Sequence, residues 1–157
     1  MSSQTPQGAL LIAEYLLWKA QQEGVQITNK KMQKLLYYVQ AWSAAINNKP
    51  MFNDKIEAWI HGPAIKSVYL AFQEFGANPI VKEINSARIE SISAESRLLI
   101  DKVWNVYKKY DGDYLEMLTH NEDPWQQARG KVEPHMRSES EITLDSMRKF
   151  YAAKLVS

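Results

Sequence analysis

Residues 32–46 read MQKLLYYVQAWSAAI, and this stretch decides the fold class. Its apolar side chains recur every three or four positions, the spacing that places them on one face of an α-helix. Alanines and tyrosines fill much of the remaining surface, and a helix that is apolar nearly all round is normally buried. We therefore predict a central core helix that Thr28 caps. Its expected packing stripe is Met32, Leu35, Leu36, Val39, Trp42, Ser43 and Ile46.

Helical spacing also dominates the chain on both sides of this stretch. Residues 9–20 form one apolar face, and Gly24 after them is typical of a left-handed helix end. Gly62-Pro63 is expected to begin a further helix, because proline suits the first helical turn, and Gly76 is expected to end it. Later helices are expected to begin at or just after Ser93, Tyr114, Asp123 and Thr143.

The last two of these helices carry specific signals. Asp123 is expected to be an acidic N-cap, with Pro124 at the first helical position and Gln126 closing a capping box. Thr143 is expected to cap the final helix. The packing stripe of that helix is predicted to be Leu144, Met147, Tyr151 and Leu155.

One short segment departs from helical spacing. Ile56, Ala58 and Ile60 alternate with their neighbours at a period of two, which indicates a strand. Residues 78–92 are expected to be loop with one edge strand, and residues 130–140 an exposed polar connection. The predicted fold is mainly α: a compact single-domain bundle of about six helices, over residues 1–157, with a small β element near residues 56–60.

Composition removes several classes of function. A formal net charge of +1 over 157 residues lacks the positive field that most nucleic-acid binding needs. The absence of cysteine excludes disulfides, thiol nucleophiles and cysteine-ligated metals. No apolar run approaches the roughly 20 residues of a membrane helix. We expect a cytoplasmic protein with no cofactor.

Residues 119–123, Thr-His-Asn-Glu-Asp, form the densest cluster of groups able to do chemistry. His120 and Glu122 are too few for a closed metal site, and no cysteine is available to complete one. We interpret the cluster as a junction between helices, where Thr119, His120 and Glu122 satisfy free backbone groups. We therefore expect no catalytic or metal-ligating residues. A small-molecule-binding protein or enzyme that uses His120, Glu122 and Lys34 is the alternative from another class.

Two further groups could bind a partner. Trp59, His61 and Pro63 form either a rigid, partly exposed aromatic corner or a corner that covers the core, and tryptophan is common in both settings. Trp125 and Arg129 lie four residues apart on one helix and could stack as a cation–π pair. Lys34 interrupts an apolar run and could reach a carboxylate or a partner, although a solvated position is favoured.

Three segments resemble the Panacea domain, also called SocA-like: residues 34–43, 57–63 and 118–129. They occur in the order and spacing of that family, and the similarity covers nearly the whole chain. Any one motif would be weak, but three in register are specific. The motif residues that we expect to be structural are Leu35, Tyr37, Tyr38, Trp42, Gly62, Thr119, His120, Glu122 and Pro124.

This resemblance implies a bacterial, phage- or prophage-associated antitoxin that is not an enzyme. Such a protein neutralises a toxin encoded by a neighbouring gene through direct protein–protein contact. A second possibility is an adaptor that delivers the toxin to an ATP-dependent protease through the exposed 130–140 segment. The expected partner-binding residues are Trp59, His61, Pro63, Lys34, Trp125 and Arg129.

Overall fold

A computed structural model describes residues 8–156, which form eight α-helices, one short 3-10 helix and three strands. The fold is mainly helical with a small β element, as predicted, although the helices exceed the expected six. The helices are α1 (Ala9–Glu23), α2 (Asn29–Asn47), α3 (Lys66–Ala71), α4 (Ser86–Glu90), α5 (Ala94–Tyr107), α6 (Gly112–His120), α7 (Asp123–Arg129) and α8 (Leu144–Leu155). The 3-10 helix is Gln73–Phe75, and the strands are β1 (Ile56–Trp59), β2 (Gly62–Ala64) and β3 (Glu141–Ile142).

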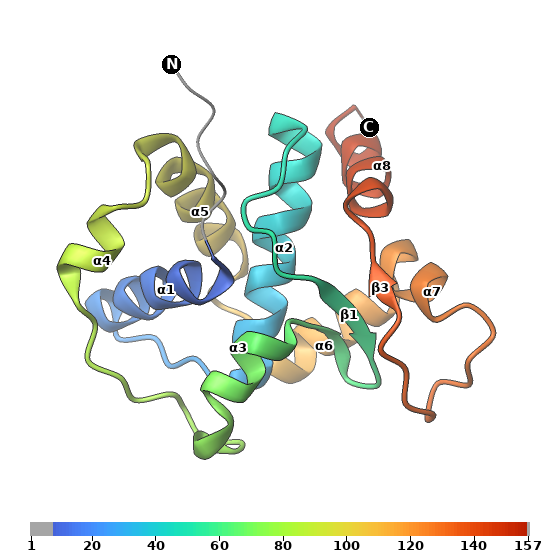
Figure 1. Ribbon diagram of the computed structural model, residues 1–157, viewed down its shortest axis with the longest axis horizontal. Helices are drawn as coiled ribbons and strands as arrows, with labels where there is room; N and C mark the ends of the chain where they lie inside the picture. Colours follow the sequence, from blue (N-terminus) through green and yellow to red (C-terminus); the bar gives the residue numbers. More distant parts are fainter. Residues whose placement is uncertain (1–7, 157) are drawn as a thin grey trace.

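Helix α2 occupies the centre of the molecule, which confirms the main sequence prediction. It lies between α1, α4 and α5 on one side and α7 and α8 on the other (Figure 1). The side chains of Leu35 and Leu36 are wholly buried, and the helix packs against α5, α6 and α8. Thr28 caps the helix as predicted, because its hydroxyl accepts a 3.2 Å hydrogen bond from the backbone N–H of Lys31.

Two residues at the ends of predicted packing stripes lie on the surface instead. Ile46 is 50% exposed and Leu155 is 52% exposed. Ile46 belongs to the last turn of α2, which Asn48 ends in the left-handed conformation, and Leu155 is the last residue of α8. The apolar spacing in the sequence therefore extends beyond the part of each helix that packs in the core.

The β element is a three-stranded antiparallel sheet in the order β2-β1-β3. The predicted helix start at Gly62-Pro63 is wrong, since these residues pair with β1 as a hairpin and α3 begins only at Lys66. Gly62 has a φ of +105°, which favours glycine and suits the hairpin turn after Trp59. Proline is tolerated in the edge strand β2, because its missing N–H does not interrupt the hydrogen bonds between the strands.

Residues 78–92 contain helix α4 where an edge strand was expected. The side chain of Asn85 caps this helix by accepting a 2.9 Å hydrogen bond from the backbone N–H of Ala87. Within this segment, the sheet-like contact is an isolated bridge between Pro79 and Thr28. The helix that Asn85 caps is thus too short for its sequence to show the apolar spacing of an α-helix.

Candidate functional site

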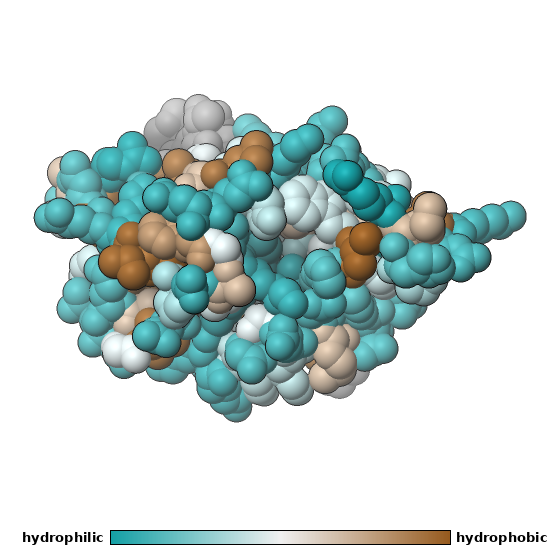
Figure 2. Space-filling model, turned by 90° about the horizontal axis from the view of Figure 1, so that it is seen from below, coloured by the Kyte–Doolittle hydropathy of each residue, from teal (hydrophilic) through white to brown (hydrophobic). Residues whose placement is uncertain are grey.

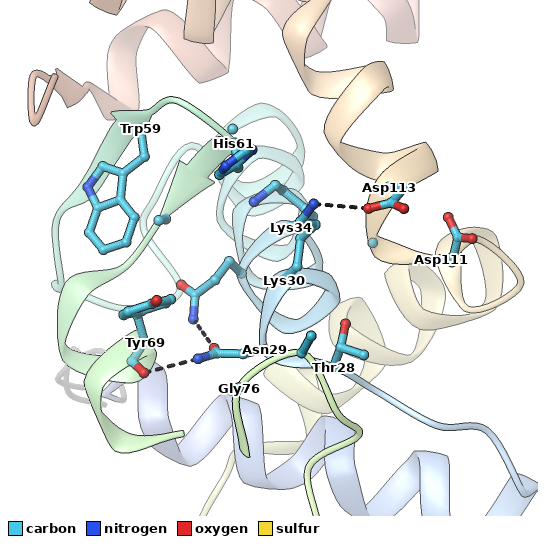
Figure 3. A pocket seen from close by; sticks show the side chains of 15 residues that line it. Thr28, Asn29, Lys30, Lys34, Trp59, His61, Tyr69, Gly76, Asp111 and Asp113 are labelled. Atoms are coloured by element: carbon cyan, nitrogen blue, oxygen red, sulfur yellow. Dashed lines mark hydrogen bonds and ion pairs between the residues drawn. The ribbon is translucent and has the colours of Figure 1, made fainter. Parts of the chain in front are cut away.

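An open hollow of about 520 Å³ lies between the first half of α2, the β1-β2 hairpin and the start of α6 (Figure 3). We call it the Lys34 hollow. It brings together Trp59, His61 and Lys34, three of the predicted partner-binding residues. The remaining lining side chains include Thr28, Asn29, Lys30, Gln33, Tyr69, Asp111 and Asp113.

The floor of the hollow contains a pair of buried amides that sequence reasoning missed. The Gln33 side-chain N–H donates to the Asn29 side-chain oxygen over 2.9 Å, and Asn29 donates to the backbone oxygen of Tyr69 over 3.1 Å. The Gln33 oxygen accepts a 2.7 Å hydrogen bond from the backbone N–H of Ile65. Both amides therefore serve to hold the chain after β2 against α2. Their spacing of four residues on one helix was the signal available in the sequence.

Lys34 is buried, so the predicted solvated position is wrong. Its side chain is 2% exposed, and its ammonium donates a 3.1 Å hydrogen bond to the backbone oxygen of Pro63. Burial lowers the pKa of Lys34 to about 7, because the charged form loses its water. A Cβ at Gly62 would lie 2.6 Å from Lys34 Cε, so a side chain there would displace the end of Lys34, and the φ of +105° independently favours glycine.

Two of the acidic groups near the hollow, Asp113 and Glu116, already pair with Lys30. Lys30 pairs with Asp113 at 2.9 Å and with Glu116 at 2.7 Å. The Nδ1 atom of His61 lies 3.1 Å from the second Glu116 oxygen. Burial raises the pKa of Glu116, but the hydrogen bonds from Lys30 and His61 outweigh it and the net pKa is lowered. Lys34 is not a member of these ion pairs, although the Glu116 charge acts on it from a distance.

Trp59 forms a half-buried ridge between the Lys34 hollow and a second hollow of about 350 Å³. Its ring meets Tyr69 edge-on at 5.1 Å, and its indole N–H donates to Glu57 over 2.8 Å. Leu70, which lines the second hollow, is 54% exposed, and the side chain of His61 is 70% exposed. We call Trp59, His61, Tyr69 and Leu70, with the two hollows, the hairpin face.

Figure 2 looks at the molecule from below and shows hydrophobic side chains in separate patches, each surrounded by hydrophilic ones. This side has no continuous apolar surface in that view. A partner that binds this side would therefore contact individual apolar side chains and hollows rather than one large continuous apolar surface.

Trp125 and Arg129 lie behind the hairpin and support it. They form the predicted cation–π pair, with the guanidinium 5.0 Å from the ring, but Arg129 is 4% exposed and Trp125 is 7% exposed. The Trp125 indole N–H donates to the backbone oxygen of Trp59 over 2.8 Å. Arg129 donates to the backbone oxygens of Ala58 at 3.0 Å and Met136 at 2.6 Å, so it fixes the exposed 130–140 segment against β1.

The junction between α6 and α7 differs from the expected cap. Helix α7 begins at Asp123 and its N-cap, Glu122, makes no capping hydrogen bond through its side chain. The Gln126 side chain donates instead to the backbone oxygen of His120 over 2.8 Å, so the predicted capping box is absent at this junction. Thr119 donates to the backbone oxygens of Leu115 and Glu116.

His120 packs against Trp125 with parallel rings, 4.1 Å between centroids. Its Nε2 atom is buried without a hydrogen-bond partner and lies 4.0 Å from a Glu116 oxygen. Burial lowers the pKa of His120 and thereby favours the neutral ring. His120 therefore contributes an aromatic surface at the junction.

Glu122 does not satisfy backbone groups as expected, because it accepts hydrogen bonds from tyrosines. The Tyr151 hydroxyl donates to one carboxylate oxygen over 2.5 Å and the Tyr38 hydroxyl over 3.2 Å. The Tyr151 hydroxyl also lies 3.3 Å from that of Tyr37. Burial raises the pKa of Glu122 in spite of these hydrogen bonds. We call Tyr37, Tyr38, Tyr151 and Glu122 the tyrosine cluster.

The residues of the enzymatic alternative do not line one common hollow. Glu122 and His120 are not among the lining residues of the Lys34 hollow. No group of three or more His, Asp or Glu residues able to hold a metal lies within residues 8–156. No helix in the same range is long and apolar enough to cross a membrane.

Comparison with known proteins places this architecture in a family. The chain matches the antitoxin SocA-like, Panacea domain over residues 32–126, which run from α2 into α7. It is also 35% identical over 81 residues to a protein named antitoxin SocA from Caulobacter vibrioides (strain NA1000 / CB15N). That alignment covers 50% of this chain and 43% of the relative, and no solved structure matches. Both matches support an antitoxin role. The chain belongs to the antitoxin SocA-like, Panacea domain family.

Proposed function

We propose that this chain is a non-enzymatic antitoxin that neutralises a toxin, encoded by a neighbouring gene, by direct contact through the hairpin face. The family and the name of the Caulobacter relative support the antitoxin role. The observation that carries the direct contact is Trp59, a half-buried, rigidly held indole between two hollows.

Trp59 has the properties of an interface anchor. Its ring is held by Tyr69 and Glu57, and its backbone oxygen by Trp125, so little side-chain entropy is lost on binding. Interfaces of about 1,600 Å² draw most of their energy from a few such aromatic or arginine residues. The neighbouring hollows and the exposed Leu70 supply the concave and apolar surroundings that an anchor needs.

Trp125 and Arg129 act in this proposal as positioning residues. They hold β1 and the 130–140 segment from behind, and both are buried. Pro63 is buried as well and contributes its backbone oxygen to Lys34. The contact surface is then formed by Trp59, His61, Tyr69 and Leu70.

Delivery to a protease is the second candidate. The residues between 130 and 140 are nearly all exposed, and Arg129 fixes the segment at Met136. An exposed tract beside the hairpin face could contact a protease while the toxin is bound. In that case, substitution of the exposed side chains at residues 131–135, which line neither hollow, preserves toxin binding but removes protection in cells.

Protection of cells that co-express the toxin tests the main proposal. We expect Leu70→Ser and Trp59→Ala to lose protection, while the purified proteins stay folded. Leu98→Ser and Trp18→Ala are matched controls, because Leu98 is 59% exposed on α5 and Trp18 is partly buried on α1. Full protection by both hairpin variants would contradict the proposal and move the interface elsewhere.

A further inference from the structure

We propose that the Lys34 hollow receives a carboxylate side chain, from an aspartate or glutamate of the toxin, and that Lys34 is its counter-ion. This inference rests on the proposed function and specifies the chemistry that the partner presents.

The Lys34 ammonium is able to donate further hydrogen bonds. An ammonium carries three N–H donors, and Lys34 uses one hydrogen bond, to the backbone oxygen of Pro63. Within residues 8–156, no carboxylate lies within ion-pair distance of it. Burial disfavours the charged form of Lys34, although Glu116 favours it from a distance, and a carboxylate in direct contact would stabilise the ammonium further.

The acids around the hollow are already engaged. Glu116 and Asp113 pair with Lys30, and Glu116 also contacts His61. Asp111 caps α6 by accepting a 2.8 Å hydrogen bond from the backbone N–H of Tyr114. Movement of any of them to Lys34 would break an existing ion pair or cap. These acids are therefore not free to contact Lys34, whereas a bound partner can supply a carboxylate that does.

The hollow is shaped to admit such a group. Its volume of about 520 Å³ falls within the roughly 300–1,000 Å³ of typical binding pockets, and its rim residues His61, Gly76 and Asp113 are exposed. Figure 3 shows Lys34 below His61, with Trp59 and Tyr69 on the neighbouring wall. Those rings would contact the aliphatic part of an acidic side chain.

A protein side chain is favoured over a free small anion by the position of the hollow. Trp59 lines both the Lys34 hollow and the second hollow, where Leu70 is exposed. The hollow is therefore continuous with the proposed contact surface. A toxin seated on Trp59 would close the hollow and remove water from a Lys34–carboxylate pair, which strengthens such a pair.

The test compares Lys34→Met with Lys102→Met, which removes an exposed lysine from α5. The dissociation constant of the purified toxin is measured for both variants and for wild type, with thermal unfolding as the check on folding. We expect Lys34→Met to weaken binding at least tenfold, mainly through faster dissociation, and Lys102→Met to leave it unchanged. Replacing the matching toxin acid by its amide should remove the effect of Lys34→Met.

Two results separate the failure of this inference from that of the proposed function. Wild-type affinity in Lys34→Met, with weak binding by Trp59→Ala, overturns the carboxylate site and keeps the hairpin face. Wild-type affinity in both variants overturns both. If Lys34→Met does not fold, the unmodified complex is treated with a carbodiimide, which joins a lysine amine to a carboxylate in contact with it. A Lys34 link to a toxin Asp or Glu supports the site, and toxin links at other lysines alone overturn it.

Discussion

The tyrosine cluster and the Lys34 hollow each bury one acid or base, Glu122 and Lys34, and they provide it with different numbers of hydrogen-bond partners. Glu122 accepts hydrogen bonds from the hydroxyls of Tyr38 and Tyr151, whereas Lys34 donates to one backbone oxygen. Burial raises the pKa of Glu122 and lowers that of Lys34 to about 7. We propose that Glu122, with several internal hydrogen bonds, serves the fold, whereas Lys34, with one, is available to a binding partner.

Leu36→Ala should have the largest effect, because both regions are built on α2. Leu36 is wholly buried, and removal of a buried leucine side chain costs about 2–5 kcal/mol. Chemical denaturation should show this loss. The control Ile46→Ala, on the exposed end of the same helix, should change stability far less. Equal losses in the two variants would show that the core is not centred on Leu36.

Glu122→Ala should come next, with a loss of about 1–3 kcal/mol, because it leaves buried tyrosine hydroxyls without their acceptor. Glu122→Gln keeps an acceptor oxygen and should lose less. Since burial raises the pKa of Glu122, the folded state holds the proton more tightly, and stability should fall as pH rises from about 4.5 through the folded pKa. Denaturation of wild type and Glu122→Gln across this pH range checks the direction of the change. Only wild type should show the loss of stability that comes from Glu122.

Lys34 should give the opposite slope in a higher pH window. Its folded pKa of about 7 lies below the ordinary 10.5, so the unfolded state binds more protons between these values and stability rises with pH. The slope is at most about 1.4 kcal/mol per pH unit and should be missing in Lys34→Met. An identical pH profile in both proteins would show that Lys34 is solvated.

The contribution of Lys34 to the pH dependence of stability must be separated from those of the titratable groups around it. Lys30 lies on the same helix, His61 on the hairpin, and Glu116 and His120 on α6. The difference between wild type and Lys34→Met is therefore the measured quantity, since these groups are present in both proteins.

His120→Ala should have the smallest effect of the four. Its stacking on Trp125 is worth about 0.5–1.5 kcal/mol, and toxin binding should weaken only in proportion to the loss of stability. Thermal unfolding and a binding titration on the same sample measure both. A large loss of affinity in a fully stable protein would place His120 in the interface.

The sequence was sufficient for the long helices and their order, but not for α4 or for the start of α3. The apolar period of α2 is complete within 15 consecutive residues, 32–46, so its burial could be predicted without knowledge of its partners. Gly62-Pro63 could not be assigned in the same way, because the same dipeptide suits a helix start and a hairpin. Pairing with β1, which no local pattern shows, decided between them.

The candidate site was predicted in part. Trp59 and His61 were identified from their residue types, and both line the Lys34 hollow. The burial of Lys34 could not be predicted, because it depends on the hairpin crossing α2 at Gly62. The tyrosine partners of Glu122 come from α2 and α8, so no spacing around Glu122 could have indicated them.

Hydrogen exchange of the chain, free and bound to the toxin from the neighbouring gene, tests the central claim most directly. It needs no substitution and reports which backbone segments the partner covers. We predict slower exchange over residues 59–72, from the hairpin turn through α3, and unchanged exchange over α5. Protection confined to residues 78–92 or 130–140, with none over 59–72, would contradict the account.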